Sequence, residues 1–114
     1  MDKVRIFDLK DSSVKELPFH VMSRTLINEK VGGVHLRLGI GECEVGVESD
    51  EHTRTWDEVV YYISGEAILE ITDGPTYKLG AGNLIVVPRG IKHRHRNAGK
   101  VKLQQLFLQA EPAD

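Results

Sequence analysis

The chain is poor in cysteine and contains no long apolar run. Cys43 is the single cysteine among 114 residues, so neither an internal disulfide nor a multi-cysteine zinc site is possible. No uncharged apolar stretch is long enough to span a bilayer, and residues 1–10 lack the basic-then-apolar pattern of a secretory leader. We therefore expect one soluble domain over residues 1–114, in the cytoplasm and with no membrane partner.

Net charge and aromatic content are also low. The formal net charge is -2 and aromatic residues make up 6% of the chain. Acidic residues nevertheless crowd the segment from Glu42 to Asp57, and basic residues crowd the segment from Arg89 to Lys102. The basic segment has no interleaved aromatic residues, which argues against a nucleic-acid partner. We expect the two segments to form cross-strand charge pairs on a solvated face.

A helical period is absent, and short strand-like runs take its place. Apolar residues alternate with other residues over Val34–Ile40, and β-branched or aromatic residues dominate Val59–Ile63, Ala67–Thr72 and Leu84–Val87. Many short strands separated by glycine and proline turns predict an all-β sandwich or barrel, because closure of the sheet removes exposed edges. In the first run His35 lies opposite the apolar residues. The alternation does not show which face is the interior, and such a histidine is more often a surface residue than part of a site.

Two runs in the middle of the chain concentrate the residues suited to chemistry. Their recurring positions are Gly46, His52, Arg54, Glu58 and Gly65 in the first run, and Gly82, Pro88, Gly90, His93 and Asn97 in the second. A hairpin between the runs returns the chain beside itself, so the two runs can converge. Since strand side chains alternate between faces, His93 and His95 share one face, and His52 shares a side with Arg54.

These two runs resemble the two signature motifs of the cupin family. The second run matches at every position, whereas the first departs where the family usually has a second histidine and this chain has Arg54. The resemblance implies an all-β, single-domain, cupin-type double-stranded β-helix, or jelly-roll barrel, with residues 46–97 as its motif core. It also implies a homodimer, with N-terminal strands within residues 1–30 at the interface.

In cupins the positions that match His52, Glu58 and His93 are metal ligands. Two imidazoles and one carboxylate suit Fe(II), Mn(II), Ni(II), Co(II) or Zn(II) and leave positions open for substrate or dioxygen. Arg54 cannot be a fourth ligand because its guanidinium has no lone pair to give; His95 or water could complete the set. A guanidinium repels a metal ion but forms a charge-assisted pair with an empty Glu58. A metal-free cupin and a purely structural polar interior therefore remain alternatives.

The candidate catalytic residues are Arg54, His95 and Tyr62. An inward Arg54 could clamp a carboxylate or enolate beside the metal, so we expect a small anionic organic substrate. Counting by twos from Glu58 turns Tyr62 toward the cavity.

Three hypotheses for the function follow from these residues. The first is a metal-dependent enzyme that oxygenates, decarboxylates or isomerises its substrate. The second is a metal-free isomerase, epimerase or cyclase with His95 or His52 as general base and Arg54 as the oxyanion partner. The third is a protein that binds or senses a small acid without turnover, since the fold alone cannot choose among them.

Two features stay open at the level of the sequence. Trp56 lies between Arg54 and Glu58 and could be a lid, a subunit contact or a plug. Gln105, Phe107 and Gln109 share one face of the last strand, but the alternation does not show which face points inward.

Overall fold

Nine strands account for most of the computed structural model, which describes residues 6, 8, 10, 14–17, 21–49 and 51–112. The strands are β1 (Val14–Leu17), β2 (Val21–Val31), β3 (Val34–Cys43), β4 (Asp57–Ser64), β5 (Glu66–Ile71), β6 (Thr76–Gly80), β7 (Leu84–Val87), β8 (His93–Asn97) and β9 (Leu103–Pro112). The N-terminal strands expected within residues 1–30 thus lie partly outside the described residues. No helix in the described segments is long and apolar enough to cross a membrane.

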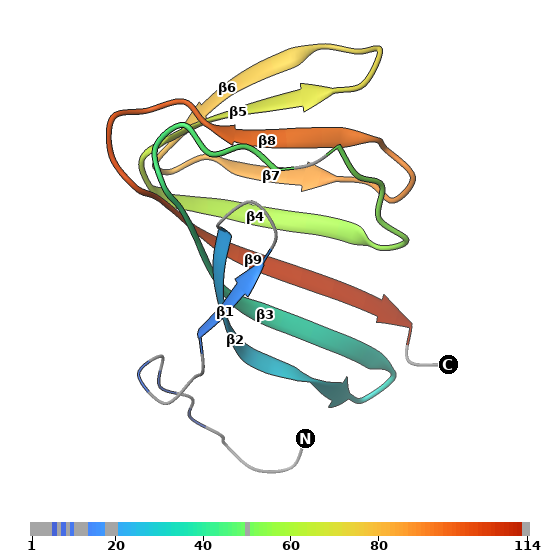
Figure 1. The fold of residues 1–114 in the computed structure, drawn as a ribbon. Coiled ribbons are helices and arrows are strands. Elements are labelled where there is room, and N and C mark those ends of the chain that lie inside the picture. Colours follow the sequence, from blue (N-terminus) through green and yellow to red (C-terminus); the bar gives the residue numbers. More distant parts are fainter. Residues whose placement is uncertain are drawn as a thin grey trace.

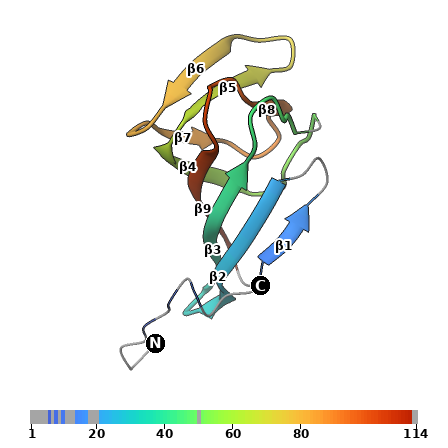
Figure 2. The ribbon, with the colours of Figure 1, turned by 60° about the vertical axis from the view of Figure 1, so that its left-hand side comes forward.

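The strands form two antiparallel sheets. One has the order β1-β2-β3-β9-β4-β7, and the other has the order β6-β5-β8. Figure 1 shows the smaller sheet at one end of the molecule and β1 and β2 at the other, and Figure 2 shows the same arrangement after rotation. The segment before β4 runs beside β8 through the bridges Glu48–Arg96 and His52–His93. The two motif runs therefore converge, as the hairpin between them predicts.

The register across the larger sheet shows which faces point inward. Glu58 of β4 is paired with Gln109 of β9, and Tyr62 with Gln105. Glu58 and Tyr62 are 7% and 0% exposed, and directly paired residues project from the same face of a sheet. The face of β9 that carries Gln105, Phe107 and Gln109 is consequently the inward one.

The same register turns the polar side of β3 inward. Arg37 is paired with Gln109 and His35 with Glu111, so the alternating apolar residues of β3 lie on the outer face. The expectation that His35 is a surface residue is corrected by this register: His35 is half-buried on the inward side. β3 also continues past its expected end to Cys43, because Gly41–Cys43 pair with Leu103–Gln105 of β9.

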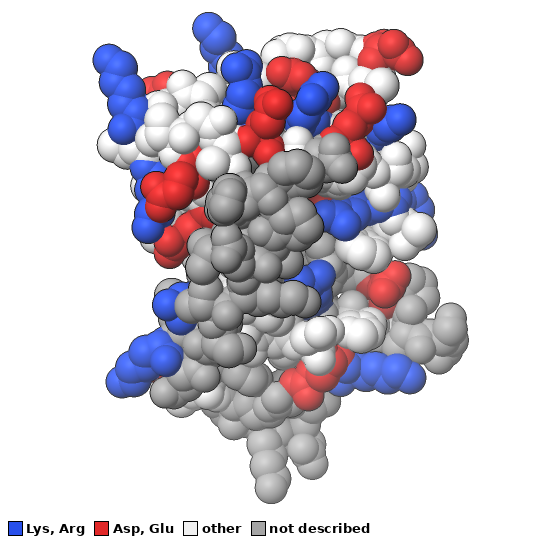
Figure 3. Space-filling model, in the orientation of Figure 1, with Lys and Arg blue, Asp and Glu red and all other residues white. Residues whose placement is uncertain are grey.

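Ion pairs join the acidic and basic segments, as expected. Lys92 Nζ lies 3.4 Å from Glu51, Lys102 Nζ lies 3.2 Å from Glu42, and Arg89 Nε lies 3.3 Å from Asp57. In Figure 3 acidic and basic side chains are interleaved over the end of the molecule that holds the smaller sheet. This surface therefore carries mixed charge with no extended basic patch over the residues drawn in colour.

Candidate metal centre

His93 begins β8 and is 1% exposed. Its Nδ1 lies 2.8 Å from the backbone oxygen of Ile91, and because a carbonyl oxygen only accepts, Nδ1 carries the proton. When the ring is neutral, Nε2 therefore carries a lone pair; this buried atom makes no hydrogen bond among the described residues, and the atom that faces it is Glu58 Oε2, at 3.4 Å. A histidine whose second nitrogen donates to a backbone carbonyl is the usual arrangement of a metal ligand.

Glu58 lies opposite His93 on β4. Its Oε2 is 3.4 Å from His93 Nε2, and its Oε1 is 3.0 Å from Arg54 Nε. Burial alone would raise the pKa of Glu58, but the neighbouring His93 imidazole and Arg54 guanidinium lower it to about 2. Burial likewise opposes protonation of His93, yet the Glu58 carboxylate raises the pKa of that imidazole. Glu58 is therefore a carboxylate at neutral pH.

His52 completes a three-residue cluster. Its backbone exchanges hydrogen bonds with His93, at 2.9 Å from His52 N to the His93 oxygen and 3.0 Å in return. The two ring centroids are 4.3 Å apart, and Nε2 of His52 is 3.9 Å from Glu58 Oε1. One ligand atom from each of His52, Glu58 and His93 lies within 4.8 Å of the others, so small side-chain adjustments would place all three about 2.1 Å from one ion.

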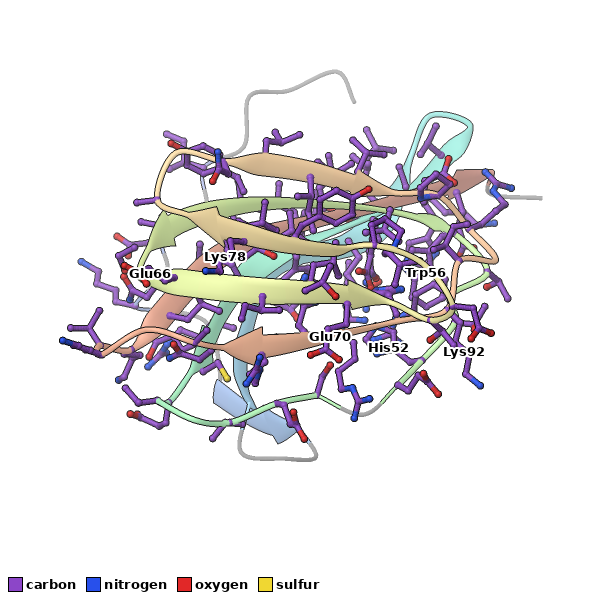
Figure 4. The ribbon with its side chains drawn as sticks, turned by 90° about the horizontal axis from the view of Figure 1, so that it is seen from above. His52, Trp56, Glu66, Glu70, Lys78 and Lys92 are labelled. Atoms are coloured by element: carbon purple, nitrogen blue, oxygen red, sulfur yellow. The ribbon has the colours of Figure 1, made fainter. Side chains whose placement is uncertain are left out.

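The donor set therefore fits a divalent transition metal. Two imidazole nitrogens and one carboxylate oxygen converge on one point, and the unpartnered His93 Nε2 is the atom that most needs an electron-pair acceptor. The predicted ligand residues are thus brought together, and in Figure 4 His52 lies at the same end of the barrel as Trp56.

Arg54 occupies the position where the sequence departs from the cupin motif. Its guanidinium pairs with Glu58 Oε1 and lies 5.6 Å from the centre of the Trp56 ring. The side chain is 41% exposed, so part of its donor fork faces solvent. Arg54 lies on the same side as His52, as the alternation predicts.

His95 and Tyr62 form a second polar pair deeper in the barrel. The Tyr62 hydroxyl is 2.8 Å from His95 Nε2, and Tyr62 is fully buried, which agrees with the prediction that it faces inward. Burial lowers the pKa of His95 to about 4 and, together with the Glu58 charge, raises the pKa of Tyr62. Both groups are uncharged at neutral pH. Among the described residues His95 does not belong to the cluster that could hold an ion.

One feature near the site escaped the sequence analysis. A cavity of about 210 Å³ lies against Trp56 and is lined by Asn28, His35, Arg37, Trp56, Gln109 and Glu111. The signal in the sequence was the polar side of β3, where His35 and Arg37 alternate with aliphatic residues. The alternation alone does not show which side of that strand forms the interior.

Comparisons with known proteins agree with the fold and the motifs. A model of the cupin domain family matches residues 35–108. The chain is 26% identical over 110 residues to the polyketide synthase CurC of Streptomyces cyaneus, covering 94% of this chain and 71% of that protein.

Two solved structures share the fold. The polyketide cyclase RemF from Streptomyces resistomycificus superposes with a TM-score of 0.78 at 22% identity, covering 100% of this chain and 82% of that one. A predicted oxalate decarboxylase from Thermotoga maritima gives a TM-score of 0.81 at 15% identity, with 92% and 97% covered. The prediction of an all-β jelly-roll barrel is confirmed, and the chain belongs to the cupin family.

Proposed function

We propose that the protein is a metal-dependent cupin enzyme that moves a proton on a small, enolisable organic substrate. One divalent transition metal would be held by His52, Glu58 and His93. The observation that carries the proposal is the buried, unpartnered Nε2 of His93, which the Ile91 carbonyl orients toward Glu58. The resemblance to a polyketide synthase and to the fold of a polyketide cyclase supports cyclisation or isomerisation as the reaction class.

The residues around the centre suit proton transfer next to a carbonyl group. A bound metal would supply Lewis-acid polarisation of the substrate carbonyl. The part-exposed Arg54 guanidinium offers hydrogen-bond donors for negative charge that develops on the substrate oxygen. His95 is an uncharged proton acceptor whose ring is held by Tyr62 at 2.8 Å. An anionic, enolisable substrate would use both the metal and Arg54.

Metal analysis tests the first half of the proposal. Protein purified without added metal, then dialysed against Zn(II) or Co(II), should bind one ion per chain, and His93→Ala should abolish this binding. The matched control is His35→Ala, because His35 is a half-buried histidine outside the cluster. A folded wild-type chain that takes up none of these ions would refute the metal centre.

Solvent deuterium exchange tests the second half. The metal-loaded protein should accelerate exchange at the carbon next to the carbonyl in at least one of a panel of 2-oxo and 3-oxo acids, followed by NMR. Arg54→Gln should reduce that acceleration without removing the metal. A metal-loaded protein that binds members of the panel but exchanges none of them would instead support a binding or sensing function.

A metal-free cyclase or isomerase is the second candidate, and the Arg54–Glu58 contact favours it. A guanidinium 3.0 Å from the carboxylate already supplies a positive charge to Glu58. In this case exchange activity would survive treatment with a chelator.

A homodimer that uses residues 1–30 also stays a prediction, which sedimentation equilibrium would test.

A further inference from the structure

A row of polar side chains leads away from the proposed centre across the inward face of the larger sheet. Glu58 is paired with Gln109, Gln109 with Arg37, and Arg37 with Asn28. Paired residues project from one face, and neighbouring strands lie about 4.8 Å apart. The backbone of Arg37 is therefore two strand spacings, roughly 10 Å, from that of Glu58.

The cavity of about 210 Å³ lies along this row. Its remaining walls come from the adjoining pair His35–Glu111 and from Trp56. Trp56 is shared with the proposed centre, because the Arg54 guanidinium lies 5.6 Å from its ring. The volume is smaller than that of a typical pocket for a whole drug-sized ligand, so it suits one part of a longer molecule.

Arg37 and Glu111, the arginine and the glutamate that line the cavity, form no ion pair with each other. Arg37 lies 5.5 Å from the centre of the Phe107 ring and makes a long hydrogen bond of 3.4 Å to Gln109, but it forms no ion pair with a carboxylate among the residues that the structure describes. Glu111 is also half-buried; the charge of Arg89 interacts with it, but no ion pair to it occurs in the described part of the chain. A guanidinium has five N–H donors and a carboxylate has several acceptor sites, so both groups keep hydrogen-bonding capacity for a ligand.

We propose that this cavity is the distal subsite for the substrate and that it takes a planar, hydroxylated ring. The ring would lie against Trp56, one hydroxyl would donate to Glu111, and a second oxygen would accept from Arg37. Because Arg37 and Glu111 contribute opposite charges, a neutral ring with both donors and acceptors fits better than a simple carboxylate. The inference rests on the proposed function and extends it to substrates with at least two fused or linked rings, which the distance to Glu58 requires.

Trp56 is the only tryptophan of the chain, so a single indole N–H resonance reports on this cavity. The test titrates the metal-loaded full chain with 2,7-dihydroxynaphthalene and follows that resonance in ¹⁵N-edited spectra. Calorimetry supplies the Kd. We expect a saturable shift, and at least tenfold weaker binding of 2,7-dimethoxynaphthalene, which cannot donate.

Substitutions locate the binding. Arg37→Gln and Glu111→Gln should each weaken binding of the diol at least tenfold, and Arg37→Lys, which keeps the charge but loses the planar fork, should have an intermediate effect. The controls Lys78→Gln and Glu66→Gln remove exposed charges at the opposite end of the barrel from Trp56 (Figure 4) and should change the Kd less than twofold. Far-ultraviolet circular dichroism confirms that each variant is folded.

The outcomes separate this inference from the proposed function. A chain that binds the diol through Arg37 and Glu111 but takes up no metal supports the subsite and refutes the metal centre. A chain that binds metal normally, but whose affinity for the diol is unchanged in both variants, refutes the subsite and leaves the metal centre standing. Equal affinity for the diol and the diether would also overturn the inference.

Discussion

Replacing Arg54 by glutamine should tighten metal binding, because it removes a positive charge beside a proposed ligand. The guanidinium Nε is 3.0 Å from Glu58 Oε1, and a metal would lie about 2.1 Å from a carboxylate oxygen. If the metal binds Oε1, the two positive centres would be at most about 5 Å apart. Their repulsion opposes metal binding in the wild-type protein.

The size of this repulsion depends on how well solvent screens it. For charges of one and two at about 5 Å, Coulomb's law gives roughly 2 kcal/mol in water and roughly 7 kcal/mol at an effective dielectric constant of 20. The Arg54 side chain is 41% exposed, so we take the lower figure. About 2 kcal/mol corresponds to roughly a thirtyfold lower Kd for the metal in Arg54→Gln.

Competition with a chromophoric chelator for Zn(II) or Co(II) measures this change. The matched control is Arg89→Gln, because the Arg89 guanidinium pairs with Asp57 at 3.3 Å and not with Glu58. A Kd that stays within threefold of the wild-type value in Arg54→Gln would refute the reasoning, since the metal could not then be bound by Glu58 next to this guanidinium.

Three further predictions concern stability. The pKa of Glu58 is about 2 in the folded protein against an ordinary 4.5, so its stabilising effect is present above pH 4.5 and is lost as the pH falls toward 2. The metal-free protein should lose about 3 kcal/mol of unfolding free energy over this range in urea titrations. In Glu58→Gln this part of the pH dependence of the unfolding free energy should be absent. Tyr62→Phe leaves half-buried His95 without its 2.8 Å partner and should lower the unfolding free energy by about 1–3 kcal/mol in the same assay. Gly39→Ala should lower the melting temperature markedly, because the new Cβ would lie 2.7 Å from Cζ of Phe107 and still closer to the backbone oxygen of Arg24. The control Gly41→Ala meets ordinary contacts at 3.4 Å and should change the melting temperature little.

The convergence of the site could be predicted from the sequence because it depends on two regular features. Motif spacing selected His52, Glu58 and His93, and the alternation of strand side chains selected Tyr62 as inward-facing. Both features are set by the strand backbone. The pairing of β4 with β7 and the bridge between His52 and His93 then hold these residues beside one another. The expected bounds of β7 also agree with the structure, since Pro88 ends this strand sharply.

The inward face of the larger sheet could not be predicted, because this barrel reverses the usual rule. Alternating aliphatic residues normally mark the buried side of a strand. In this chain the interior of the larger sheet is partly polar, while Tyr61, Leu84 and Val86 on the outer side are 40%, 57% and 58% exposed. The alternation in β3 therefore left the inward face open, and it gave no reason to consider Arg37.

The Arg54–Glu58 contact also lay beyond the sequence, because Arg54 precedes β4 in an irregular segment. A period of two fixes the side on which a strand residue lies, but it does not say where a long side chain ends. The structure shows that the Arg54 guanidinium contacts Oε1 of Glu58 and that Oε2 of Glu58 faces His93.

The two oxygens of Glu58 have different neighbours, and this bears on Arg54, the residue at which the chain departs from the cupin motif. Arg54 and a metal need not exclude each other, because Oε1 contacts the guanidinium while Oε2 faces the unpartnered His93 nitrogen. A carboxylate that already accepts a charge-assisted hydrogen bond gives less electron density to a metal, so the ion would be held more weakly and would polarise a substrate oxygen more strongly. Arg54→His, by adding an imidazole in place of this donor, would then bind metal more tightly and yet catalyse proton transfer more slowly. Affinity and activity should therefore change in opposite directions, which a purely structural Arg54 would not produce.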